Sequence, residues 1–435
     1  MAVSAVSCGC NLRRAGRPSY DSSTGGDAHP ANRHTHRRSV SLNVQVSNEH
    51  PSDSRRCRIH RTLAYYGAFV ALGLVHSSLG PTLPDLAEQT QARLKEVSFL
   101  FTTRSFGYLI GALGGGRLFD RTLGHPVLMA VLLIMAVTMA LVPFTETVWL
   151  LATVLCLLGL AEGTLDVGCN TLLVWSHPRS VGPFMNGLHF FFGVGSFLSP
   201  IVVAEVAYLT GSIKWAFWVL ALLNLPVVLW LMLLPGPPIP AEEEDNRDET
   251  KKEAPVAPFV LFFLLYVGAE VAMGGWVYAY ALTLESVDES KAAYLTSAFW
   301  GALTVGRLLG IPASAKFRPV VVLAVDLLGC LLCAGLMLVW QQSLVRLWIT
   351  TLGLGLFMAS VFPMTLALAG ERMTITGRVT GWFFVGSSIG SMTLPWLIGQ
   401  LFESEGPWIL PAAVLFVLVC AGLLLVLLNL RRPVA

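Results

Sequence analysis

The stretch GALGGGRL at Gly111–Leu118 is written a second time as GALTVGRL at Gly301–Leu308, 190 residues later, with six of the eight positions in agreement. A second echo follows in the same order. Gly195-Ser-Phe-Leu-Ser-Pro200 returns as Gly390-Ser-Met-Thr-Leu-Pro395, 195 residues on. We interpret the two echoes as traces of an internal repeat. Chance agreement between short Gly- and Leu-rich strings is the alternative.

The composition indicates that this chain of 435 residues lies in a membrane. Hydrophobic residues make up 54% of it and charged residues only 13%. This charged share is about half of that in an ordinary soluble domain. A soluble core could not bury so much apolar surface, so lipid is the expected solvent. The formal net charge of +2 does not indicate a nucleic-acid partner. The eight cysteines show no metal-ligand spacing, and we expect no metal and no cofactor.

Apolar segments of spanning length follow one another from Leu63 onward. Each is about 20 residues long, which is the length that crosses a hydrocarbon core of about 30 Å. Helices are required there because no water satisfies the backbone groups. We therefore predict an all-α membrane protein with twelve transmembrane helices in two pseudo-symmetric six-helix bundles. Their expected centres are Leu72, Leu109, Leu133, Leu157, Phe197, Leu222, Glu270, Leu303, Leu328, Leu354, Ser388 and Leu418.

Two polar segments set the domain boundaries. Residues 1–58 are rich in Arg, Ser, His and Gly without an apolar period, which predicts a disordered basic cytoplasmic tail. An organelle transit peptide is the alternative for this tail. Residues 235–257 combine prolines with mixed charges and predict a cytoplasmic linker. The bundles are then expected at 59–234 and 258–435.

The distribution of Lys and Arg among the loops predicts the orientation. With a cytoplasmic N-terminus, and with the tail ignored, the inner loops hold twelve such residues and the outer loops five. Positive charge collects on the cytoplasmic side of membrane proteins, so both termini are expected there. We expect a multi-pass monomer in the plasma membrane or in a bacterial inner membrane.

Ionisable side chains within the spans are candidates for function, because they cost several kcal/mol unless they are paired or hydrated. Glu162 and Asp166 share one face of the fourth span, and Asn170 continues that face. Glu270 lies in the middle of the seventh span and His189 lies early in the fifth. We expect these five residues to bind substrate or a coupling ion.

Other polar groups in the spans are open to two interpretations. Arg104 is a counter-ion for a helix-four acid or a ligand. Asp326 is a coupling group or the partner of a nearby cytoplasmic base. Aromatic rings stack on sugars, so Tyr266, Trp276 and Trp382 are substrate candidates. Such rings, and Trp300 with them, also serve as anchors at the membrane interface.

The segment Gly116-Arg-Leu-Phe-Asp120-Arg121-Thr-Leu-Gly124-His resembles the loop between helices two and three of the major facilitator superfamily. The resemblance implies that Asp120 and Arg121 belong to a cytoplasmic gate that bridges helix ends in the outward-open state. By the repeat, Arg117 and Arg307 are expected at equivalent places on the cytoplasmic ends of helices two and eight. A charged loop that merely follows the positive-inside rule is the alternative.

Further segments look like the fucose-permease branch of that superfamily, and more closely like its sodium-dependent glucose transporter subgroup. The resemblance implies that Asp166 and Asn170 match an acidic-xxx-Asn pair in which the acid is implicated in coupling. His189 and Phe192 depart from the Gln and Asn typical of fucose permeases, and helix one lacks their acid. The coupling ion therefore stays open. The segments are Gly80-Pro-Thr-Leu-Pro84, Arg104-Ser-Phe-Gly-Tyr108, Leu165-Asp-Val-Gly-Cys-Asn170, Leu188-His-Phe190 and Tyr266-Val-Gly-Ala-Glu270.

Two related halves with one site between them are typical of transporters that work by alternating access. We therefore predict a secondary active transporter for a sugar or another small polar solute, coupled to H⁺ or Na⁺. Efflux of a hydrophobic metabolite, lipid or drug is one alternative, and a non-transporting receptor or scaffold is another. An enzyme is not expected, because the chain shows no nucleophile elbow, phosphate loop or metal-ligand cluster.

Overall fold

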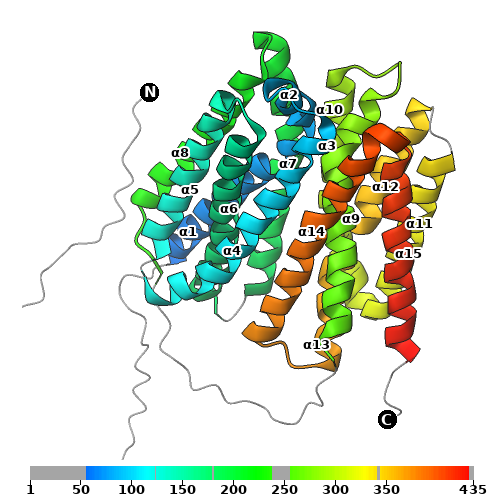
Figure 1. Cartoon of the computed structure of the whole chain (residues 1–435). Coiled ribbons are helices and arrows are strands. Elements are labelled where there is room, and N and C mark those ends of the chain that lie inside the picture. Colours follow the sequence, from blue (N-terminus) through cyan, green and yellow to red (C-terminus); the bar gives the residue numbers. More distant parts are fainter. Residues whose placement is uncertain (1–54, 123, 179–180, 238–254, 340–342, 431–435) are drawn as a thin grey trace, which may run out of the picture.

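The computed structural model describes residues 55–122, 124–178, 181–237, 255–339 and 343–430. Most of the predicted tail and of the predicted linker lie outside these ranges, so both remain predictions. The described residues are almost entirely helical. Figure 1 shows two groups of long helices side by side, one in blue to green and one in lime to red.

The first half is built from residues 55–232. Its α1 and α2 are bent by 43° at a short break and act as one span. Its elements are α1 (Arg55–His76), α2 (Leu79–Gln89), α3 (Leu94–Val97), α4 (Phe99–Arg121), α5 (Gly124–Leu141), η1 (Val142–Phe144), α6 (Val148–Ser176), α7 (Val181–Thr210) and α8 (Ile213–Met232).

The second half is built from residues 257–430, and its α12 and α13 together form one span. Its elements are α9 (Ala257–Leu282), α10 (Glu289–Lys316), α11 (Pro319–Val339), α12 (Leu344–Met358), α13 (Val361–Arg372), α14 (Gly377–Glu405) and α15 (Ile409–Leu430). With α3 and η1 as connections, the two halves hold six spans each. The predicted fold of twelve helices in two bundles is confirmed.

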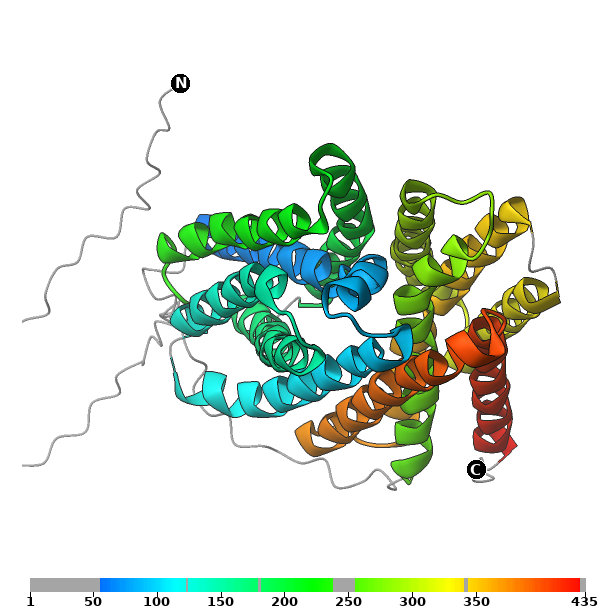
Figure 2. The same cartoon turned by 45° about the horizontal axis from the view of Figure 1, so that its top comes forward.

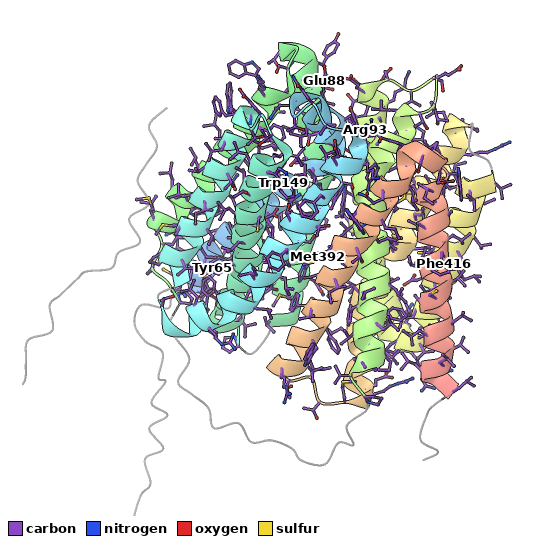
Figure 3. The ribbon with its side chains drawn as sticks, viewed as in Figure 1. Tyr65, Glu88, Arg93, Trp149, Met392 and Phe416 are labelled. Carbon is purple, nitrogen blue, oxygen red and sulfur yellow. The ribbon has the colours of Figure 1, made fainter. Side chains whose placement is uncertain are left out.

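The outer surface of both bundles is apolar. Trp149 on α6 is 75% exposed and Phe416 on α15 is 68% exposed, and Figure 3 labels both on the outside of the bundles. Among the described helices, eight are long and apolar enough to cross a membrane, or nine with the bent pair. The spans α4, α10 and α14 fall outside that set. They carry polar side chains such as Arg104, Arg307 and Ser388, which face the interior.

Matching glycine contacts in the two halves show by how many residues the internal repeat is offset. Gly73 on α1 packs against the backbone of α7 at Gly195. In the second half, Gly268 on α9 packs against the backbone of α14 at Gly390. Small residues allow helix backbones to approach this closely. Both members of the second contact lie 195 residues after their counterparts, which is the offset of the Gly-Ser-…-Pro echo.

The GALxxGRL echo, offset by 190 residues, is therefore out of register by five residues. Gly159 on α6 packs on the backbone of Arg104, and Gly355 on α12 packs on that of Phe299, which supports an offset near 195. The counterpart of Arg117 is thus near Pro312. The expectation that Arg117 and Arg307 are equivalent is wrong. Strings of Gly, Ala and Leu recur wherever helices pack closely, so they match easily in the wrong register.

The two halves contact each other at one end, which we call the closed end. Figures 1 and 2 show α4 and α14 approaching there and diverging toward the opposite end. Hydrogen bonds that cross the halves here include Thr102 Oγ1 to the Met392 carbonyl (2.9 Å), Ser98 Oγ to the Trp396 carbonyl (3.4 Å), Gln400 Nε2 to the Lys95 carbonyl (2.9 Å) and the Leu94 amide to Glu403 Oε1 (3.0 Å).

Candidate functional site

A cavity of about 580 Å³ lies between the two halves. Its walls come from α1, α2, α4, α6 and α7 on one side and from α9, α10, α13 and α14 on the other. It runs from the break between α1 and α2, beneath the closed end, to Thr171, Met185 and Leu366. This volume is typical of a site for a small molecule.

Most of the residues predicted for the site line this cavity. Glu162, Asp166 and Asn170 reach it from α6, as predicted from their shared helix face. His189 reaches it from α7, where its ring lies edge to face against Phe69 with the centroids 5.8 Å apart. The cavity lining also contains Glu270, Arg104 and Arg307.

Three aromatic residues predicted for the site lie outside the cavity lining. Tyr266 is 1% exposed and donates its hydroxyl to the Met358 carbonyl at 2.7 Å. Trp276 is fully buried, and its indole donates to the Pro395 carbonyl at 2.9 Å. Trp382 is 51% exposed near the start of α14. The first two side chains are held by interhelical hydrogen bonds rather than presented to a solute.

Arg104 and Glu162 form a buried ion pair between α4 and α6. The guanidinium donates from Nε to Glu162 Oε2 at 2.8 Å and from a terminal nitrogen to Oε1 at 2.5 Å, which is the two-pronged geometry that arginine favours. It also donates to the carbonyls of Val75 (3.1 Å) and His76 (2.9 Å), where α1 ends. Arg104 thus joins three helices and satisfies the carbonyls that the break leaves free.

Asp166 is held by neutral donors. Its carboxylate accepts a hydrogen bond from the Tyr108 hydroxyl and another from Asn170 Nδ2 at 2.9 Å. No arginine or lysine within ion-pair distance of Asp166 occurs among the residues that the structure describes. A carboxylate in this setting leaves its charge to be balanced by a proton or a cation.

Arg307 and Glu270 form a second ion pair, on the opposite wall of the cavity. Their nearest nitrogen and oxygen atoms are 3.7 Å apart, which is longer than a hydrogen bond. The side chains are 23% and 13% exposed, compared with 8% and 1% for Arg104 and Glu162. Arg307, which was predicted for the gate, lies in the cavity beside Glu270 rather than at the end of its helix.

The other predicted gate residues lie at the end of α4. Arg117 is exposed, and among the described residues its side chain reaches only the Leu113 carbonyl of its own helix, at 3.5 Å. The side chains of Asp120 and Arg121 lie outside the described residues. The gate therefore stays a prediction.

Ser77 and Ser387 line the cavity without having been predicted for the site, and so does Trp300, which was open to two interpretations. Each has a buried polar atom without a hydrogen-bond partner in the described part of the chain. Serine is common in helices and gives no pattern that marks it in the sequence. Asp326 lies outside the cavity lining, 8% exposed, and accepts from Ser360 Oγ at 2.5 Å near the break between α12 and α13.

Comparison with known proteins identifies relatives over most of the chain. The family model described as Major Facilitator Superfamily matches residues 65–392. "Major facilitator superfamily domain-containing protein 4A" of Mus musculus is 28% identical, over 82% of this chain and 89% of that protein. "Sodium-dependent glucose transporter 1" of Xenopus laevis is 30% identical, over 74% of this chain and 72% of that protein.

Two solved structures share the fold. The nucleoside transporter NupG matches with a TM-score of 0.68 and 14% identity, over 86% of this chain and all of that chain. A bacterial homologue of the human lysosomal transporter Spinster, described as inward-facing and occupied, matches with a TM-score of 0.70 and 14% identity. That match covers 88% of this chain and all of the other.

Proposed function

The chain belongs to the major facilitator superfamily, and we propose that it is a secondary active transporter that moves a sugar or a similar small polar solute by alternating access. The observation that carries this proposal is the cavity between the two halves, which lies beneath a closed end and is lined by charged groups from both sides. Such groups are expensive within a membrane and are expected where a solute or an ion passes.

The pairing of charges within the cavity supports an uncharged solute. Arg104 is paired with Glu162 and Arg307 lies beside Glu270, so each positive charge already has a partner. Serine hydroxyls on α14 and the amide of Asn170 add groups that can hydrogen-bond to hydroxyls. Relatives that carry the name sodium-dependent glucose transporter add support for a sugar.

Asp166 is the proposed coupling residue. Its carboxylate faces the cavity and is held by the neutral donors of Tyr108 and Asn170. A proton or Na⁺ is therefore left to neutralise its charge. Carboxylate and amide oxygens are suitable ligands for a hard cation. The names of the relatives favour Na⁺ over H⁺ as the coupling ion.

With the termini in the cytoplasm, the closed end faces the outside and the cavity belongs to an inward-facing state. Arg117, Asp120 and Arg121 would then take part in a gate when the opposite state forms. We propose a monomer in the plasma membrane or in a bacterial inner membrane. Efflux of a hydrophobic metabolite is the second candidate, because rings such as Phe69, Phe192 and Phe384 also line the cavity.

Uptake into proteoliposomes tests the proposal. We expect labelled D-glucose to accumulate when an inward Na⁺ gradient is imposed, and less so with K⁺ in its place. Asp166→Asn should abolish accumulation above equilibrium, because the charge that the ion neutralises is gone. Glu285→Gln, at an exposed loop position, is the matched control. Gradient-driven accumulation by Asp166→Asn at the normal level would contradict the coupling role. Export of a hydrophobic dye without sugar uptake would favour efflux.

A further inference from the structure

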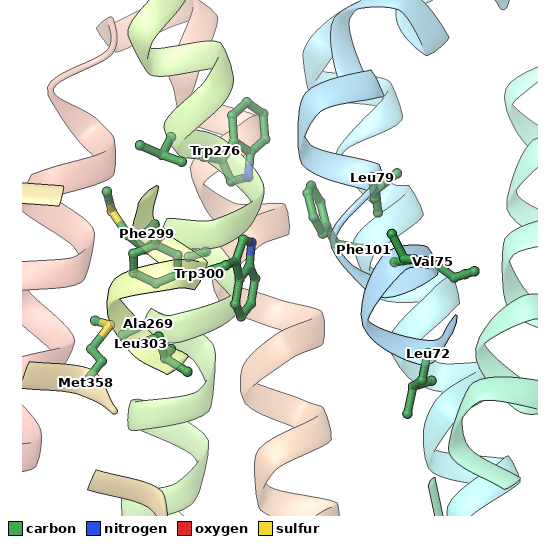
Figure 4. Close-up of a cluster of buried hydrophobic side chains, with 14 of the residues drawn as sticks. Leu72, Val75, Leu79, Phe101, Ala269, Trp276, Phe299, Trp300, Leu303 and Met358 are labelled. Atoms are coloured by element: carbon green, nitrogen blue, oxygen red, sulfur yellow. The ribbon is translucent and has the colours of Figure 1, made fainter. Parts of the chain in front are cut away.

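Trp300 on α10 is held firmly at the boundary between the two halves. It is 4% exposed and lines the cavity beneath the closed end. Figure 4 shows its ring projecting from the second half toward Val75 and Phe101 of the first. The ring lies edge to face against His76, with the centroids 6.0 Å apart and the planes at 83°. It also presses on Gly274, where an added Cβ would lie 2.4 Å from a ring atom.

The indole nitrogen of Trp300 is buried without a hydrogen-bond partner among the described residues. An indole N–H can only donate, and a buried donor without an acceptor is unfavourable. Other tryptophans in the chain satisfy this group. Trp276 donates to the Pro395 carbonyl at 2.9 Å and Trp218 donates to the Ala140 carbonyl at 3.3 Å. The donor of Trp300 is therefore left for something that enters the cavity.

A second unsatisfied group lies on the other half of the protein. Ser77 follows His76 directly at the break between α1 and α2, is 4% exposed and lines the same cavity. Its Oγ is buried without a partner in the described chain. The neighbouring Ser78 is satisfied in the usual local way, because it donates to the Val75 carbonyl at 2.8 Å. His76 connects the residues of the two unsatisfied groups, because it precedes Ser77 in the chain and its ring contacts that of Trp300.

We propose that Trp300 and Ser77 form a subsite for a hydroxyl group of a neutral, ring-shaped solute such as a monosaccharide. The hydroxyl accepts a hydrogen bond from Trp300 Nε1 and donates one to Ser77 Oγ. The two residues belong to opposite halves, so a solute bound here connects α10 to the end of α1 just beneath the closed end. The subsite rests on the proposed function, because it requires a hydroxylated solute in the cavity.

Binding of D-glucose and its monodeoxy analogues to the purified full-length protein tests the subsite. We expect one analogue to bind the wild type about five- to 150-fold more weakly than D-glucose, because its missing hydroxyl takes part in two neutral hydrogen bonds. Trp300→Phe keeps an aromatic ring but removes the donor. It should bind D-glucose about two- to tenfold more weakly, which is the effect of one neutral hydrogen bond, and should distinguish that analogue from D-glucose less well than the wild type does. Trp149→Phe, at an exposed position, should behave as the wild type.

Ser77→Ala provides an independent variant in case Trp300→Phe does not fold. It removes only one oxygen atom and should weaken discrimination against the same analogue. If neither variant changes that discrimination while the wild type binds D-glucose, the subsite is wrong and the proposed function stands. If the wild type binds none of D-glucose, D-galactose and L-fucose, both the subsite and the sugar proposal are wrong.

Discussion

The two ion pairs of the cavity differ in how tightly they are built. Arg104 and Glu162 meet through two hydrogen bonds, are almost fully buried, and also secure the end of α1. Arg307 and Glu270 are more exposed, and a single contact of 3.7 Å joins a guanidinium nitrogen to a carboxylate oxygen. The first pair holds the helices of its half together. The second can open at little cost, because little hydrogen bonding would be lost.

The halves also secure their broken spans differently. In the first half, Arg104 binds the carbonyls where α1 ends. In the second half, the hydroxyl of Tyr266 binds the Met358 carbonyl where α12 ends. A charged group therefore binds the carbonyls at the helix break in the first half, and a neutral hydroxyl binds the carbonyl at the break in the second. This leaves Arg307 and Glu270 of the second half available to the cavity.

The largest effect is expected from Arg104→Ala. It leaves the Glu162 carboxylate buried without its partner and frees the carbonyls of Val75 and His76. Removal of one member of a buried ion pair destabilises proteins by about 3–5 kcal/mol. Thermal unfolding in detergent measures the change, with Arg318→Ala, at an exposed position, as the control. Adding Glu162→Gln to Arg104→Ala should recover part of the loss. A loss below about 1 kcal/mol would show that this pair is no tighter than the other.

A smaller effect is expected from Tyr266→Phe. It removes the hydroxyl that binds the Met358 carbonyl but keeps the buried ring. Hydrogen bonds between helices in membranes contribute about 0.6 kcal/mol on average, so the loss of stability should be about that size. Tyr280→Phe on the same helix is the matched control, because Tyr280 is a buried residue whose hydroxyl has no hydrogen bond within the described chain. An equal loss of stability in both variants would show that the hydrogen bond of Tyr266 does not stabilise the break between α12 and α13.

The smallest effect on stability is expected from Glu270→Gln. The amide keeps the shape of the side chain, and many partly exposed ion pairs contribute nothing measurable to stability. Glucose uptake should fall nonetheless, because the variant leaves Arg307 without its carboxylate at the cavity wall. Melting temperature and uptake are measured on the same preparation. Loss of stability as large as that of Arg104→Ala, or unchanged uptake, would remove the distinction between the two pairs.

The spans and the main cavity residues could be predicted from the sequence. Apolar segments separated by polar gaps define the spans, since lipid requires a minimum apolar length. The high cost of a charge in lipid likewise identified Glu162, Asp166 and Glu270 as interior groups. Asn170 and His189 were found through their helix positions, and both line the cavity.

Other features depended on how the helices rotate against one another, which a single sequence does not record. Tyr266 and Trp276 share α9 with Glu270, yet both side chains turn to neighbouring carbonyls. Trp300 was expected to be either an interface anchor or a cavity residue, and burial distinguishes the two. The register of the repeat depended on which glycines touch which backbones, and the more similar of the two echoes gave the wrong offset.

That register has a consequence for how such a chain can diverge after a gene duplication. Alanine at Gly159 would place its Cβ 1.9 Å from the Arg104 carbonyl, and alanine at Gly390 would place its Cβ 2.0 Å from that of Leu264. These glycines at close helix contacts cannot be substituted, because any larger residue would collide with the main chain of the neighbouring helix. Side chains that point into the cavity are not restricted in this way. The two halves that descend from a duplication can thus keep the same arrangement of helices, while each half acquires its own set of charged residues.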